Sequence, residues 1–117
     1  MVKTKSIYSP ESPDDGLRIL VMRYWPRGIK KERASLWLRE LGPGTGLIKR
    51  WKAGELTWAA FAREYKTEFN IDARKKAFAG LKEIIKKTGS APVTLLCACP
   101  DEETCHRGLL KKMLEKE

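Results

Sequence analysis

Two short segments of this 117-residue sequence carry the side chains that could do chemistry. The first is Arg23-Tyr24-Trp25-Pro26-Arg27-Gly28, in which two guanidinium groups flank a turn set by proline and glycine. Guanidinium forks suit the paired oxygens of phosphate or carboxylate, so Arg23 and Arg27 are candidate anion-binding residues. Trp25 is a candidate wall of the same pocket. The alternative is structural, with these arginines tying the loop to an acidic side chain or to the carboxyl end of a helix.

The second segment, residues 97–108, holds all three cysteines and the only histidine of the chain. Cys105, His106 and Arg107 are predicted to begin a helix, where the helix dipole and nearby cations favour a thiolate and free N–H groups bind anions. Cys105 and His106 are therefore candidate catalytic residues, and Arg107 is a third candidate for anion binding. Cys97 and Cys99 point to one face of a predicted strand and are expected to line the pocket, unless they are inert core cysteines.

Other chemistries fit the spacing of this segment less well. A phosphatase-like loop needs a cysteine six residues before its arginine, whereas Asp101 stands six before Arg107. Three thiolates and an imidazole are a legitimate set of zinc ligands, but a C-x-C pair followed by the adjacent Cys105 and His106 departs from the usual C-x₂-C arrangement. We therefore expect no metal ligand and no cofactor. A thiol redox or metal-sensing role remains an alternative, because this clustered, odd number of cysteines does not form a disulfide framework.

The elements that position both segments can be predicted from hydrophobic patterning. Residues 2–8, 17–22 and 93–99 are typical of strands. Helical spacing of apolar residues predicts helices over 34–41, 47–54, 58–69 and 72–88, and from residue 104 or 105 onward. Thr57 and Asp72 are candidate N-caps, and Gly89 follows the fourth helix. Trp37, Trp51 and Trp58 lie on these helical stripes and are expected in the core.

This order of elements predicts an α/β fold for residues 1–117 as a single domain. We expect a small, mainly parallel sheet of about three strands flanked by helices. The long helical connection between the second and third strands would make them parallel, so both chemical segments would leave the same edge of the sheet.

The positive charge of the chain is concentrated in one region. Lys and Arg total 24 against 15 Asp and Glu, a net charge of +9, and residues 23–52 alone hold nine cations and two anions. That segment suggests a rival function, non-specific binding of nucleic acid. The absence of Gln and the single Asn resemble thermophile composition, which is another explanation of the charge. With no signal peptide and no apolar run of ~18 residues, we expect a cytoplasmic protein without a membrane partner.

The first chemical segment resembles the YeaO-like branch of a broad family of uncharacterised proteins (domain of unknown function 488), and the second resembles the wider family. Residues 16–28 resemble the family signature G-x-R-I-L-V-D-R-L-W-P-R-G, and Leu95-Leu96-Cys97 with Cys105-His106-Arg107 resembles the wider family's L-L-C-x-E … C-H-R. Met22 and Cys99 stand where these patterns have Asp and Glu. The resemblance brings no established activity. From the residues, we expect a pocket for a small phosphate- or carboxylate-bearing ligand, with Cys105 or His106 as its reactive group.

Overall fold

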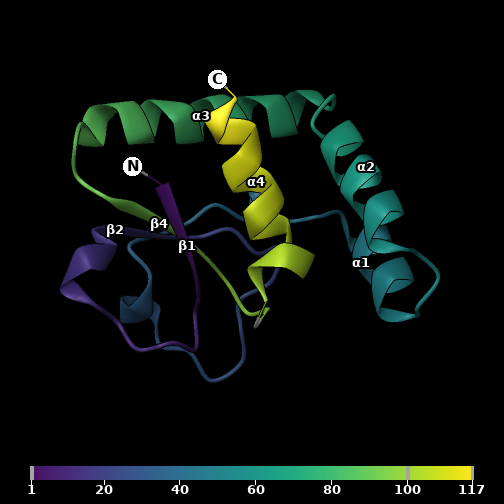
Figure 1. Ribbon diagram of the computed structural model, residues 1–117, viewed down its shortest axis with the longest axis horizontal. Helices are drawn as coiled ribbons and strands as arrows, with labels where there is room; N and C mark the ends of the chain where they lie inside the picture. The colour runs from purple at the N-terminus through teal and green to yellow at the C-terminus, as the bar shows by residue number, and fades with distance from the viewer. Residues whose placement is uncertain (1, 100, 117) are drawn as a thin grey trace.

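The computed structural model describes residues 2–99 and 101–116 and contains a four-stranded parallel sheet (Figure 1). The strands lie across the sheet in the order β1 (Val2–Ser6), β4 (Val93–Cys97), β2 (Leu17–Leu20) and β3 (Leu36–Trp37), and each pairs in parallel with its neighbour. The predicted α/β class and the parallel pairing of the second and last predicted strands are confirmed. Leu20 pairs with Leu96 and Ser6 with Cys97, so β1, β2 and β4 end at the same edge.

The fourth strand, β3, comes from the segment 34–41, which was wrongly predicted as a helix. Two 3₁₀ turns flank β3 instead, η2 (Lys31–Arg33) and η3 (Arg39–Leu41). The backbone of this segment bonds to β2: the Ser35 N–H donates to the Arg18 carbonyl at 2.7 Å, and the Leu38 N–H to the Leu20 carbonyl at 2.9 Å. Pairing with a distant strand therefore replaces the local helical bonds that the periodicity suggested.

Trp37 consequently lies exposed on β3 and not in the core, contrary to expectation. Its ring packs edge-on against Trp25, with centroids 5.4 Å apart, and its indole N–H donates to the Met22 carbonyl at 2.8 Å. Trp51 and Trp58, in contrast, are partly buried against the main hydrophobic cluster.

The other predicted helices are confirmed as α1 (Thr45–Lys52), α2 (Trp58–Glu68), α3 (Asp72–Thr88) and α4 (His106–Glu115). Thr57 caps α2 by accepting a hydrogen bond from the Ala60 N–H at 3.1 Å, and Gly89 ends α3 with a φ of 64°. Asp72 is the first residue of α3, whereas its N-cap is Ile71. Within the described residues, no helix combines the length and the apolar character needed to cross a bilayer.

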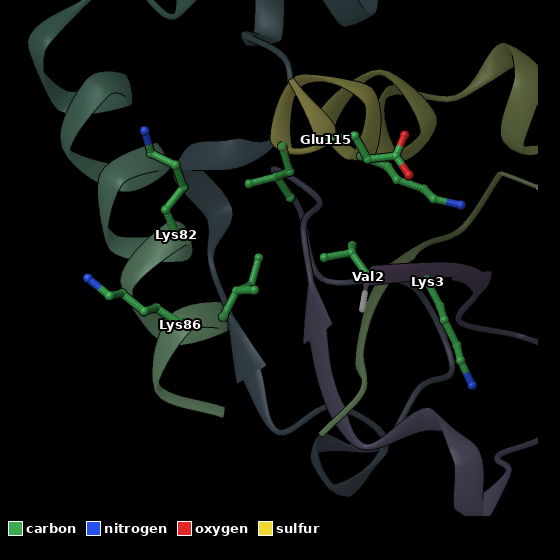
Figure 2. Close-up of a pocket in the computed structure, with 8 residues that line it drawn as sticks. Val2, Lys3, Lys82, Lys86 and Glu115 are labelled. Atoms are coloured by element: carbon green, nitrogen blue, oxygen red, sulfur yellow. The ribbon is translucent and has the colours of Figure 1, made fainter. Parts of the chain in front are cut away.

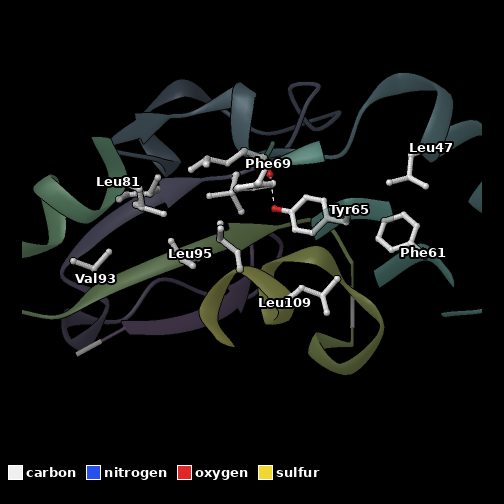
Figure 3. Close-up of a cluster of buried hydrophobic side chains, with 12 residues drawn as sticks. Leu47, Phe61, Tyr65, Phe69, Leu81, Val93, Leu95 and Leu109 are labelled. Atoms are coloured by element: carbon white, nitrogen blue, oxygen red, sulfur yellow. Dashed lines mark hydrogen bonds between the residues drawn. The ribbon is translucent and has the colours of Figure 1, made fainter. Parts of the chain in front are cut away.

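Residues of all four α-helices pack with β2 and β4 into one cluster (Figure 3). Its members are Ile19, Val21, Leu41, Leu47, Phe61, Tyr65, Phe69, Leu81, Val93, Leu95, Leu109 and Leu110. A second cluster contains Ile7, Leu20 and Leu96, covered by side chains of the loop after β2. Because side chains alternate along a strand, Cys97 continues the row of Val93 and Leu95 and faces the helices.

Two contacts hold the end of η3 between β2 and α2. Gly42 approaches the backbone so closely that a Cβ on it would lie 2.3 Å from the Arg23 nitrogen. The fully buried Tyr65 donates its hydroxyl hydrogen bond to the Leu41 carbonyl at 2.6 Å, drawn as the dashed line in Figure 3. These contacts bring the carboxyl end of β2 next to α2.

Candidate functional site

The carboxyl ends of β2 and β4 open into a cavity of about 150 Å³. Aromatic and aliphatic side chains of α1, α2 and the loop after β2 line it, together with the cysteines and the histidine. The lining residues are Met22, Arg23, Tyr24, Pro43, Ile48, Trp51, Lys52, Trp58, Phe61, Cys97, Cys99, Thr104, Cys105 and His106.

The three cysteines converge at this cavity as free thiols, with their Sγ atoms all within 4.8 Å of one another. Cys97 lies at the end of β4, and its Sγ is 3.8 Å from that of Cys99. Cys105 joins them from the N-cap position of α4. Cys97 and Cys105 are buried, whereas Cys99 is only half-buried. Cys99, expected only to line the pocket, is therefore the thiol most open to a molecule in the cavity.

His106 is buried beside the thiols and is held by the end of β2. Its Nε2 lies 2.6 Å from the Val21 carbonyl, which can only accept, so Nε2 carries the proton. Nδ1 then presents its lone pair to Cys97 and Cys105, whose Sγ atoms are 3.8 and 3.9 Å away. Burial lowers the pKa of His106, which keeps the ring neutral.

The thiols alter one another's ionisation. Hydrogen bonds from Cys105 and Cys97 lower the pKa of Cys99 to about 2, since their S–H groups stabilise its thiolate. Hydrogen bonds with Cys105 and Cys99, together with burial, raise the pKa of Cys97. A contact with Cys97 lowers the pKa of Cys105, but the hydrogen bond to Cys99 and burial outweigh it and raise that pKa to about 11. Cys99 is also the least buried of the three thiols, so a thiolate loses the least hydration there.

Of the three predicted anion-binding arginines, only Arg23 lines the cavity. Its guanidinium donates to the carbonyls of Gly42 at 3.2 Å and Pro43 at 3.3 Å, and lies 3.6 Å from the Glu40 carboxylate. Arg23 therefore ties the loop to neighbouring carbonyls, as the structural alternative from the sequence proposed, and it also lines the cavity. Lys52, which the sequence did not single out, is the other cation of the lining.

The remaining expected residues lie outside the cavity lining. Arg107 is buried, and its Nη1 donates to the Cys99 carbonyl at 2.6 Å, so it supports the thiol cluster from behind. Arg27 is exposed. Trp25 donates its indole N–H to the Ile29 carbonyl at 2.7 Å and lines a separate hollow beside β3.

Trp51, Trp58 and Phe61 form the aromatic wall of the cavity, and the two tryptophans were expected only in the core. They do pack together, with ring centroids 5.0 to 5.5 Å apart. Helical periodicity predicts which side of a helix is buried. It does not indicate which of the buried residues border a cavity.

A larger hollow of about 640 Å³ lies between α3, α4 and the start of β1 (Figure 2). Val2, Ile85 and Leu114 contribute its apolar surface, and four lysines and one glutamate contribute its charges. It contains no thiol, imidazole or hydroxyl group. The candidate reactive groups of the described residues therefore lie at the smaller cavity.

Comparison with known proteins identifies the family. The model of the active DUF488-N3 subclade (DUF488-N3a) matches residues 2–117. The uncharacterized protein YeaO of Escherichia coli is 34% identical over 115 residues, covering 97% of this chain and 96% of that protein. The uncharacterized protein Rv3073c of Mycobacterium tuberculosis is 30% identical over 115 residues, covering 97% and 92%. No solved structure matches the chain. The chain belongs to the DUF488 family, within its active DUF488-N3 subclade.

Proposed function

We propose that this protein is an enzyme that binds a small, singly anionic molecule in the cavity at the ends of β2 and β4 and acts on it through Cys99. The observation that carries the proposal is the half-buried Cys99 thiol, which lines the same cavity as Arg23 and Lys52. The other two thiols and His106 also line this cavity but are buried.

The size and lining of the cavity support a small ligand. Its volume of about 150 Å³ is below the ~300–1,000 Å³ of sites for drug-sized molecules. Most of its wall is apolar, with Trp51, Trp58 and Phe61 on one side. Only Arg23 and Lys52 supply positive charge there, and Arg23 already donates to two carbonyls. One carboxylate or phosphate group on an otherwise apolar ligand fits this lining.

Two alkylating reagents of similar size test both parts of the proposal. Iodoacetate and iodoacetamide share a leaving group and differ in charge, so the ratio of their rates reports the electrostatics around the thiol. We expect Cys99 of the reduced, metal-free protein to be the first cysteine modified, as identified by mass spectrometry. We also expect a higher iodoacetate-to-iodoacetamide ratio than for mercaptoethanol. One unit charge at about 4 Å contributes about 1 kcal/mol in water, or roughly fivefold in rate.

Charge variants show whether the cavity causes this preference. Arg23→Gln and Lys52→Gln should each lower the ratio, whereas Arg63→Gln, an exposed control on α2, should leave it unchanged. Circular dichroism confirms that each variant is folded. Modification of another cysteine first, or a ratio equal to that of mercaptoethanol, would contradict the proposal.

A further inference from the structure

We infer that Cys97, Cys99, Cys105 and His106 form a binding site for a thiolate-preferring metal ion of the zinc class. Zn–S distances of about 2.3 Å and Zn–N distances of about 2.0–2.1 Å place tetrahedral ligands about 3.8 Å apart for two sulfurs and about 3.6 Å apart for sulfur and nitrogen. Cys97 Sγ lies 3.8 Å from Cys99 Sγ and 3.8 Å from His106 Nδ1, and Cys105 Sγ lies 3.9 Å from that nitrogen. All three sulfurs fall within 4.8 Å. The three sulfurs therefore need to move by about 1 Å or less relative to one another to meet these distances, and Nδ1 nearly meets them already with Cys97 and Cys105. The remaining adjustment lies between Nδ1 and the Cys99 sulfur.

The imidazole is oriented as a metal ligand requires. Metal-binding histidines commonly donate their other ring N–H to a carbonyl or carboxylate, which fixes the tautomer. The Val21 carbonyl does this for His106, leaving the bare Nδ1 toward the sulfurs. The unusual spacing, with Cys105 directly before His106, does not prevent the two residues from facing one position in this fold. Cys105 precedes α4 in extended conformation, which brings its sulfur to the same side as the imidazole.

The hydrogen bonding around His106 Nδ1 also points to an ion. Both Cys97 and Cys105 approach Nδ1, but a neutral imidazole has one lone pair there and can accept well from only one thiol. Coordination would use every donor atom at once.

Three thiolates, one neutral imidazole and a divalent ion leave one net negative charge in a buried place. The buried Arg107 guanidinium, which donates to the Cys99 carbonyl, lies where it offsets that charge. Its Nε has no partner among the described residues.

Metal binding would control the thiol of the proposed enzyme, because an ion held by the Cys99 sulfur leaves no free thiolate. This consequence rests on the proposed function, whereas the metal site itself does not. The bound ion displaces the protons that the thiols still carry, so binding releases protons and breaks no other bond.

Titration of the reduced, metal-free chain with Co²⁺ and then Zn²⁺ tests the site. We expect one Co²⁺ per chain, with the intense visible bands of tetrahedral cobalt and sulfur-to-cobalt charge-transfer absorption, both lost when Zn²⁺ displaces it. Cys97→Ser, Cys99→Ser and Cys105→Ser should each weaken Zn²⁺ binding by at least about tenfold, as even partners outside the ligand set cost 10–100-fold. Asp101→Asn, an exposed control in the adjacent acidic loop, should bind like the wild type.

His106→Gln guards against loss of folding, because the glutamine amide can still donate to the Val21 carbonyl. It should remain folded, bind Zn²⁺ at least about tenfold more weakly and show an altered cobalt spectrum. An octahedral cobalt spectrum, no stoichiometric binding, or serine variants that bind like the wild type would overturn the inference.

The same samples separate this inference from the proposed function. Zn²⁺ should protect Cys99 from iodoacetate. Tetrahedral cobalt binding without Cys99 alkylation in the metal-free chain would refute the enzyme proposal and support the metal site. Rapid alkylation of Cys99 without any cobalt binding would do the reverse.

Discussion

Replacing Tyr65 by Phe should reduce stability without leaving a cavity, because the ring stays and only the hydroxyl is lost. That hydroxyl is fully buried and donates to the Leu41 carbonyl at 2.6 Å. Burial raises the pKa of Tyr65 well above its ordinary range, so the hydroxyl keeps its proton and donates at neutral pH. Leaving a buried carbonyl without this partner costs about 1–3 kcal/mol.

Urea unfolding followed by tryptophan fluorescence measures this loss. With an m value of ~1–3 kcal/mol per molar urea, the midpoint should fall by about 1 M. Tyr8→Phe is the matched control, since its hydroxyl donates to the Arg27 carbonyl at 3.0 Å from an exposed position. That change should alter the free energy of unfolding by no more than about 0.5 kcal/mol.

The prediction extends to the site because Tyr65 contacts both of its sides. Its ring packs edge-on against His106 at 5.6 Å, and its hydroxyl holds the turn whose Gly42 and Pro43 carbonyls accept from Arg23. Tyr65→Phe should therefore also lower the iodoacetate-to-iodoacetamide ratio. Equal effects of the Tyr65 and Tyr8 substitutions on stability would refute the reasoning.

Three further predictions concern stability and charge. Gly42→Ala should destabilise the protein by about 1–3 kcal/mol because its Cβ would overlap the Arg23 backbone. Gly80→Ala, with open space at mid-α3, should stabilise by about 0.5–1 kcal/mol in the same urea assay, and changes of equal sign would contradict the packing. Burial raises the pKa of Asp15, but hydrogen bonds from Lys5, Ser12 and Arg18 outweigh it and lower the pKa overall. Asp15 thus stabilises the fold above its unfolded pKa of about 3.9, and this stability is lost as pH falls through the lower folded value. Asp15→Asn should therefore be less stable than wild type at neutral pH, with a gap that narrows in acid; a constant gap would refute the assignment. The cations of segment 23–52 should give only non-specific retention of DNA, present at about 50 mM salt and lost by about 200 mM, in a filter-binding assay. Retention that persists at the higher salt would contradict this.

Hydrophobic patterning correctly predicted helices, whose hydrogen bonds are local, and strands that are buried along their whole length. The run at 93–97 and the stripe behind Thr57 belong to this class and were confirmed as β4 and α2. Segment 34–41 has the same apolar spacing as a helix, but its backbone groups bond to β2, seventeen residues away for Ser35 and Arg18. No local pattern distinguishes these two outcomes, because the competing partner lies elsewhere in the chain.

The position of the site in the fold could be predicted from the sequence. The direction in which each side chain points could be predicted less well. Parallel strands ending at one edge brought Arg23 and the cysteines together, as expected for residues that follow such strands. The guanidinium of Arg107 instead turned inward to a carbonyl, and that of Arg27 lies at the surface. Long side chains have several rotamers of similar energy, so the packing around them decides which is adopted.

The structure also changes what the net charge of +9 implies for recognition. Several cations of segment 23–52 already have structural partners: Arg33 donates to the Ile7 and Ser9 carbonyls, and Arg50 pairs with Glu64 at 2.6 Å. Arg39 lies over the ring of the exposed Trp37, away from the cavity. Only Arg23 and Lys52 of this segment border the cavity, against a wall of aromatic rings. Selectivity there would therefore depend first on the fit of an apolar body to that wall. A single negative group would orient the ligand, whereas the lining has too few cations for a highly charged ligand such as a nucleoside triphosphate.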